Sequence, residues 1–208
     1  MGRLAQLAPI CLASLLFACG GGGAPPTVDP PIPDPDGPLT GGTGGAKRTN
    51  ATALIDTYAP ALPITYTTLT AVPTSGSATY DGYFYGSVSG GPQNLVGDLS
   101  MAVQFTASSI TVTGGVTDVY DGDDTALTGS LTLGAGALDR GGDPNADATM
   151  TATLTGSLNS GSDTIAFGVQ LEGDFLGGTY DAIGGAAIGT ATTGSTSSDF
   201  DGGFIAER

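Results

Sequence analysis

Histidine and tryptophan are missing from this 208-residue sequence, and cysteine occurs only at positions 11 and 19. Without histidine the chain cannot form Ser-His or Cys-His catalytic pairs or histidine-based zinc sites. Lysine and arginine together number 5 against 20 acidic residues, which gives a formal net charge of −15. Such a chain is repelled by nucleic acids. We therefore predict a protein that is not an enzyme, does not bind nucleic acid and holds no cofactor beyond a covalent lipid.

The first 18 residues have the composition of a secretory signal peptide. Arg3 supplies one positive charge, and residues 4–18 are mostly Leu and Ala with no acidic residue. This apolar segment is shorter than the roughly 20 residues that a transmembrane helix needs. Its last four residues, "LFAC", resemble the lipobox of bacterial lipoproteins. The resemblance implies that residues 1–18 are removed and that Cys19 receives the lipid. The alternative is an ordinary signal peptide in which Cys19 is incidental.

The residue after Cys19 bears on the location of the protein. Gly20 stands where an aspartate retains some lipoproteins in the inner membrane. The resemblance therefore implies the bacterial outer membrane, reached through the lipid anchor, and leaves open which side of it the protein faces.

The remaining chain divides into three segments. Residues 19–46 are rich in Gly, Pro, Asp and Thr and predict a disordered tether behind the lipidated cysteine. Residues 47–77 predict a strap, with a short helix at 51–58 capped by Asn50 or Thr49 and ended by Pro60. Residues 78–208 predict one β-rich domain.

Apolar and polar residues alternate through the last of these segments. In "TIAFGVQLEG", for example, Ile165, Phe167, Val169 and Leu171 share one face of the predicted strand. A period of two marks half-buried β-strands, and Gly, Asn and Asp between the periodic stretches mark turns. Eight strands are predicted, over residues 79–89, 94–106, 109–119, 126–133, 148–158, 163–174, 178–192 and 198–207.

Eight successive antiparallel strands favour an all-β fold, an eight-stranded antiparallel up-and-down β-barrel that is soluble. A two-sheet sandwich is the alternative architecture. An outer-membrane barrel with the apolar face towards lipid is a second alternative. The 7 Phe and 7 Tyr do not form paired girdles, and the sequence ends in "FIAER" rather than in an aromatic residue. We therefore expect the apolar face inside, with Leu99, Phe167 and Val169 in the core.

Three stretches of the domain resemble a known family of surface lipoproteins. They are "VPTSGSATYDGYFYG" (72–86), "GDLSMAVQF" (97–105) and "GAAIGTATTGSTSSDFDGGFIAER" (185–208). Together they resemble the barrel domain of transferrin-binding protein B and of the related factor H-binding lipoproteins. The resemblance implies a small barrel displayed on a lipid anchor, and it implies a fold and a location more than a ligand.

Two acidic segments are candidates for ion binding. "DVYDGDD" and "DRGGDPNAD" supply Asp118, Asp121, Asp123 and Asp124, and Asp139, Asp143, Asn145 and Asp147. Asp143, Asn145 and Asp147 alternate as the oxygen ligands of a calcium loop do. Ala148 and Leu154, however, occupy the positions of the glycine and glutamate that an EF-hand requires. We interpret these residues as polar turns and keep these three as candidate calcium ligands.

The features combine into a functional hypothesis. We expect a monomeric, lipid-anchored binding module that captures a protein or a small molecule. The acidic charge favours a partner with a basic surface. The alternatives are a structural envelope lipoprotein without a specific ligand and a small transmembrane barrel. The sequence does not identify the ligand.

Overall fold

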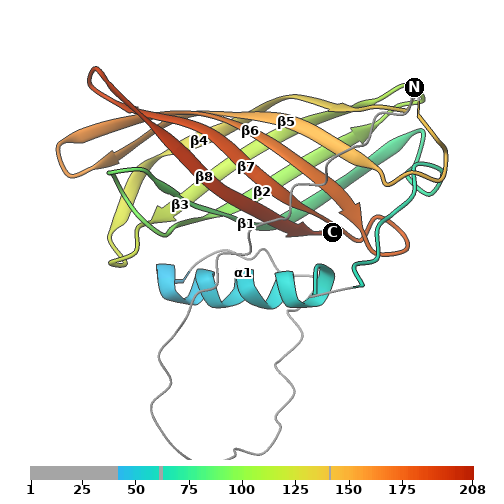
Figure 1. Ribbon diagram of the computed structural model, residues 1–208, viewed down its shortest axis with the longest axis horizontal. Helices are drawn as coiled ribbons and strands as arrows, with labels where there is room; N and C mark the ends of the chain where they lie inside the picture. The colour runs from blue at the N-terminus through green and yellow to red at the C-terminus, as the bar shows by residue number, and fades with distance from the viewer. Residues whose placement is uncertain (1–41, 61–62, 141) are drawn as a thin grey trace, which may run out of the picture. The chain divides into compact units, whose positions relative to one another are not determined.

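The computed structural model describes residues 42–60, 63–140 and 142–208. The predicted signal peptide, Cys19 and the tether up to residue 41 therefore lie outside the described residues. Within them the chain forms one helix followed by eight strands (Figure 1). The elements are α1 (Gly44–Tyr58), β1 (Gly76–Val88), β2 (Leu95–Phe105), β3 (Ile110–Tyr120), β4 (Ala126–Leu138), β5 (Thr149–Ser160), β6 (Asp163–Leu176), β7 (Ala182–Thr193) and β8 (Thr196–Glu207).

The strands close into an eight-stranded antiparallel up-and-down barrel, as predicted. Each strand pairs with the next along the chain, and β8 returns to pair with β1. The two shortest hairpins carry Gly161 and Gly194 at φ of 59° and 60°, a conformation that glycine adopts without strain. Where β8 meets β1, a Cβ on Gly82 or Gly202 would lie 2.1 Å from a carbonyl oxygen of the neighbouring strand. Glycine therefore permits the close approach at the closing seam.

The apolar face of the strands lies inside the barrel. Along β6, burial alternates residue by residue, and Leu99, Phe167 and Val169 are each at most 4% exposed, as predicted. Phe200 lies at the centre of an aromatic group, stacked on Phe84 at 5.2 Å between ring centroids and edge-on to Phe167 at 5.8 Å. These side chains fill the interior, which is the expected arrangement for a barrel of this strand number.

The outer wall is polar where α1 does not cover it. On β5, Thr149, Thr153, Thr155 and Ser157 point outward and are exposed. Among the residues that the structure describes, Ile188 is the one large apolar side chain with high exposure, at 59%. The wall therefore lacks the apolar band that faces lipid in outer-membrane barrels. Within the described ranges, no helix has the length and hydropathy of a membrane-spanning helix.

Because residues 47–58 of the predicted strap segment belong to helix α1, we keep the name strap for the part of the chain between α1 and β1. The strap crosses one end of the barrel, which we call the strap end. There the amide of Thr67 donates to the carbonyl oxygen of Phe175 at 2.8 Å, and the amide of Ala148 donates to that of Thr67 at 2.9 Å. Val72, farther along the strap, is 2% exposed and belongs to the barrel core. The strap thus closes this end of the core.

Helix α1 begins earlier than the sequence predicted. It starts at Gly44 rather than at 51, so residues 44–46 of the expected tether are helical, and it ends at Tyr58. The N-cap is Thr43, whose Oγ1 accepts a hydrogen bond from the amide of Ala46, and not Asn50 or Thr49. Glycine and threonine favour helices weakly. The early start follows from the contacts that Lys47 and Arg48, near the start of the helix, make with the barrel domain.

Candidate functional site

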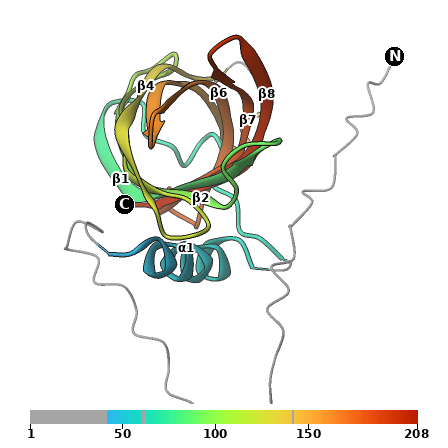
Figure 2. The ribbon, with the colours of Figure 1, turned by 90° about the vertical axis from the view of Figure 1, so that its left-hand side faces the viewer.

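Helix α1 lies against the outside of the barrel (Figures 1 and 2). It packs mainly on β1, β2 and β8, and it also reaches β3 through Lys47. Ala51 and Leu54, at 5% and 1% exposure, pack with Tyr83, Val96 and Ile205 from the wall. Apolar packing against the wall therefore stabilises a helix whose intrinsic propensity is low.

Lys47 is buried in this interface. The side chain of Lys47 is 3% exposed, and its Nζ lies 2.5 Å from Oδ1 of Asp98 and 2.9 Å from Oδ2 of Asp118. The Asp98 side chain is 13% exposed and that of Asp118 is 43% exposed. The ring of Tyr120 lies 5.8 Å from the same nitrogen. A buried cation thus meets two carboxylates from neighbouring strands.

Irregular strand pairing accompanies these carboxylates. The register of β2 with β3 shifts between Val96 and Asp98, and that of β3 with β4 shifts between Val116 and Val119. Asp118, inside the second shift, has φ of 50°, which is unusual for a residue other than glycine.

Burial lowers the pKa of Lys47, but the hydrogen bonds and charges of Asp98 and Asp118 outweigh that effect and raise the pKa above its usual value. Lys47 therefore rests as the ammonium ion.

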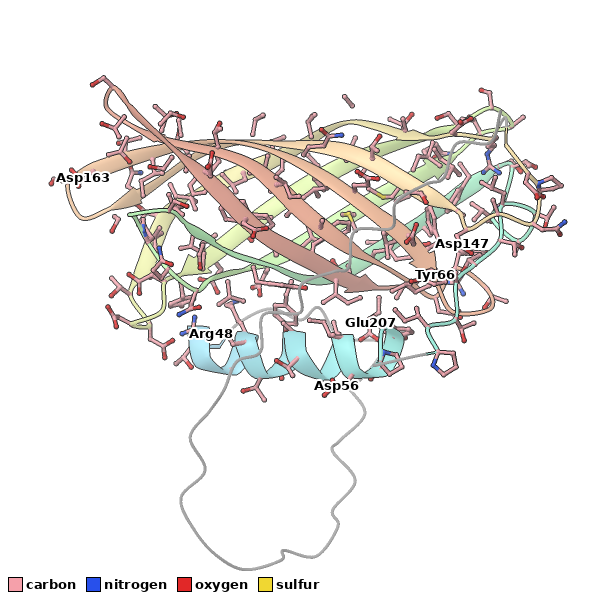
Figure 3. The ribbon with its side chains drawn as sticks, in the orientation of Figure 1. Arg48, Asp56, Tyr66, Asp147, Asp163 and Glu207 are labelled. Atoms are coloured by element: carbon pink, nitrogen blue, oxygen red, sulfur yellow. The ribbon has the colours of Figure 1, made fainter. Side chains whose placement is uncertain are left out.

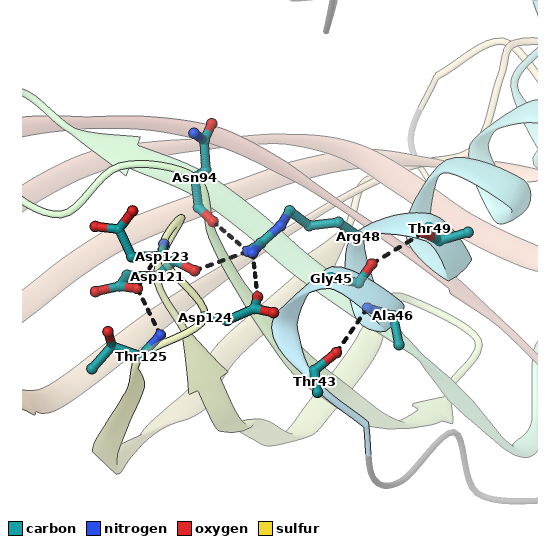
Figure 4. Close-up of polar contacts among 10 residues, drawn as sticks. All are labelled: Thr43, Gly45, Ala46, Arg48, Thr49, Asn94, Asp121, Asp123, Asp124 and Thr125. Carbon is teal, nitrogen blue, oxygen red and sulfur yellow. Dashed lines mark hydrogen bonds and ion pairs between the residues drawn. The ribbon is translucent and has the colours of Figure 1, made fainter. Parts of the chain in front are cut away.

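Arg48 joins the start of the helix to two loops (Figure 4). Its Nη1 donates to the carbonyl oxygens of Asn94 and Asp121, each at 3.0 Å, and its Nη2 lies 2.6 Å from Oδ1 of Asp124. The Asp121 carboxylate accepts from the amides of Asp123 and Thr125 and so shapes its own turn. The first acidic segment therefore serves largely to hold α1 and to form a turn.

Neutral donors hold the remainder of α1. Asn50 donates to the Tyr83 hydroxyl at 3.1 Å, and the Tyr58 hydroxyl donates to Glu207 at 3.1 Å. Burial, together with the charge of Glu207, raises the pKa of Tyr58 to about 12. Tyr58 therefore remains a neutral donor near neutral pH.

The second acidic segment lies at the strap end. Oδ1 of Asp143 accepts from the amide of Asn145 at 2.9 Å, and Asp147 forms an isolated β-bridge with Thr68. Asp143, Asn145 and Asp147 are all exposed. In the described part of the chain, no group of three or more acidic, histidine or cysteine side chains is placed to hold a metal ion. The suggestion that this segment binds calcium therefore rests on the sequence pattern alone, and the geometry of the described residues adds no support to it.

A surface hollow lies at the end of the barrel opposite the strap. Figure 3 places Asp163 at that end, with Tyr66 and Asp147 at the strap end. The hollow has a volume of about 260 Å³, and its lining includes Val88, Pro92, Asp163 and Ile165. A similar volume beside α1 is lined by Tyr58, Pro60 and Thr65. Each is smaller than the roughly 300–1,000 Å³ of typical small-molecule sites.

The arrangement around Lys47 and Arg48 was not anticipated from the sequence. Sequence patterns place both residues in the predicted strap segment, 47–77, and give neither a role. The available signal was composition, because adjacent basic residues stand out in a chain with only 5 of them. Cys19, the predicted lipidation site, lies outside the described residues, and its role stays a prediction.

Comparison with known proteins gives no relative from which a function could be transferred. No family model, no curated protein and no solved structure matches the chain.

Proposed function

We propose that this protein is a non-enzymatic binding module, held at the outer membrane by a lipid on Cys19, which captures a partner with a basic surface. The observation that carries the proposal is the separation of charge in the barrel domain. The basic side chains among the described residues all contact the chain itself, while many acidic side chains face solvent. The surface that a partner meets is therefore strongly negative.

The two remaining basic residues show how this separation arises. Arg140 donates to the carbonyl oxygens of Val72 and Pro73, which ties the 139–147 loop to the strap. Arg208 lies 3.9 Å from the Asp181 carboxylate and 4.4 Å from the centroid of the Tyr180 ring. With Lys47 and Arg48 committed to α1, these cations are engaged in holding the fold together.

Exposed carboxylates occur at several places on the described domain, and two groups of them are candidates for docking. We call the first the wall group, which comprises Glu172, Asp199 and Asp201 on β6 and β8. The second is the strap-end group, which comprises Asp143 and Asp147. Opposite potentials accelerate encounter and disfavour wrong partners, so either group favours a partner rich in Lys or Arg.

The resemblance to transferrin-binding protein B and factor H-binding lipoproteins is part of this proposal. A lipid-anchored eight-stranded barrel is compatible with it, although one fold serves many functions. The polar outer wall favours a domain that stands in water, rather than a transmembrane barrel. A structural envelope lipoprotein without a ligand remains the competing function.

The test is capture of a partner by immobilised residues 42–208 from an extract of the organism's own surface and medium. We expect at least one protein to be retained at low salt and lost as the salt concentration rises. The same extract is then applied to two variants, Glu172→Gln/Asp199→Asn/Asp201→Asn and Asp143→Asn/Asp147→Asn. One variant should lower affinity about tenfold, since each exposed ion pair contributes up to about 1 kcal/mol and 1.4 kcal/mol is a factor of ten.

The paired variants distinguish a specific site from general acidity. A docking site on one surface predicts that neutralising the other surface leaves capture nearly unchanged. Equal losses in both variants would indicate nonspecific attraction to the acidic barrel. Retention of nothing at either salt concentration would favour the structural envelope lipoprotein.

A further inference from the structure

The buried amine of Lys47 lies directly against the carboxyl group of Asp98. We propose that the two side chains form an intramolecular amide bond, between Nζ of Lys47 and Cγ of Asp98, with Asp118 as the proton relay. The bond would join helix α1 covalently to strand β2. This inference does not depend on the proposed function, because it concerns how the domain is held together rather than what it captures.

The distance and the burial favour bond formation. Nζ of Lys47 lies 2.5 Å from Oδ1 of Asp98, and the carboxyl carbon is one covalent bond beyond that oxygen. Reacting atoms held at about 3–3.5 Å gain several orders of magnitude in rate over the same groups in solution. The side chains of Lys47 and Asp98 are 3% and 13% exposed, so little water competes for the pair. The packing of Ala51 and Leu54 on the wall holds the helix, and with it Lys47, in place.

Amide formation needs a neutral amine, whereas Lys47 rests as an ammonium ion between two carboxylates. A nearby base must therefore take one proton. Asp118 is placed to do so, because its Oδ2 lies 2.9 Å from Nζ and it comes from β3, the strand next to that of Asp98. The irregular pairing of β3 and the positive φ of Asp118 accompany this placement.

The step balances without any further reactant. Asp118 accepts one of the three ammonium protons and passes it to a carboxyl oxygen of Asp98, so that a neutral amine faces a neutral carboxylic acid. Nζ then attacks Cγ of Asp98. As the C–O bond breaks, that oxygen takes a second proton from nitrogen and leaves as water. The third proton stays on the amide nitrogen, and Asp118 ends as the carboxylate it was at the start.

The position of the bond suggests what it would do. Helix α1 contains Gly44, Gly45 and several threonines, which favour helices weakly, and its attachment relies on contacts with the barrel. The amide would cross-link the helix to β2 close to the point where the chain enters the described domain. The helix would then stay attached under conditions that dissociate an ion pair, such as high salt.

Peptide mapping of the purified full-length protein by mass spectrometry tests the proposal. We expect the peptide containing Lys47 to be joined to the peptide containing Asp98, with a mass lower than their sum by one water molecule. Recovery of the two peptides only as separate, unmodified species from folded protein would overturn the proposal and leave an ion pair.

Variants test the assigned roles. Lys47→Arg keeps the positive charge but lacks the amine, so the cross-linked species should be lost completely. Asp118→Asn keeps the shape but not the base, and most of the protein should be recovered uncross-linked. Asp123→Asn is the matched control, because it removes an exposed carboxylate near Asp118 in the sequence that is not among the contacts of Lys47 or Arg48, and it should leave the cross-link intact. An unchanged yield in Asp118→Asn would overturn the relay role, and circular dichroism establishes that each variant is folded.

Discussion

Replacing Phe200 with alanine will lower the free energy of unfolding of the barrel domain by about 3–5 kcal/mol. Phe200 is 1% exposed, and its ring contacts those of both Phe84 and Phe167. Truncation removes the buried ring and leaves a cavity that a closed barrel cannot readily collapse to fill. Urea denaturation of residues 42–208, followed by circular dichroism, measures the change.

A matched substitution on the opposite face provides the control. Thr155 points outward from β5 and is exposed, so Thr155→Ala should change the free energy of unfolding by no more than about 0.5 kcal/mol. A loss below 1 kcal/mol for Phe200→Ala would mean that the aromatic group does not pack in the core as described.

The second large effect concerns attachment to the membrane. We expect Cys19→Ser to abolish incorporation of labelled palmitate and to release the protein from the membrane fraction. One acyl chain binds a membrane only marginally, and stable anchoring takes more than one chain or signal. Loss of the modified cysteine should therefore remove the lipid on which stable anchoring depends.

The other cysteine of the sequence is the control for this experiment. Cys11 lies within residues 1–18, which the lipobox resemblance assigns to the removed signal peptide. Cys11→Ser should leave labelling and membrane attachment unchanged. If Cys19→Ser still incorporates palmitate, the lipobox interpretation is wrong.

The strands could be predicted from the sequence because the rule that sets them is local. One apolar residue in every two, interrupted by Gly and Asp turns, gave the number of strands, their order and the inward faces. The prediction for β4 stopped at residue 133, although the strand runs to Leu138. The residues after 133 are Gly and Ala, and an irregular pairing between Gly134 and Ala137 interrupts their alternation. Periodicity carries little information in such a stretch.

The docking of α1 could not be predicted, because its causes are contacts between distant residues. Lys47 contacts Asp98 and Asp118, which are distant in sequence and lie on neighbouring strands beside irregular pairings of β3. In the sequence, the two glycines before Lys47 are typical of a tether. The long-range contacts outweigh the weak local preference, as is common for helices in proteins.

The apolar interior and the polar outer wall predict a barrel that stands in water rather than in a membrane. Expressing residues 42–208 without the signal peptide, and purifying them in buffer without detergent, tests this. We expect a monomer by analytical ultracentrifugation, with a β-rich circular dichroism spectrum and a cooperative unfolding transition. Aggregation in buffer, with β structure appearing only after detergent is added, would contradict this prediction and indicate a transmembrane barrel.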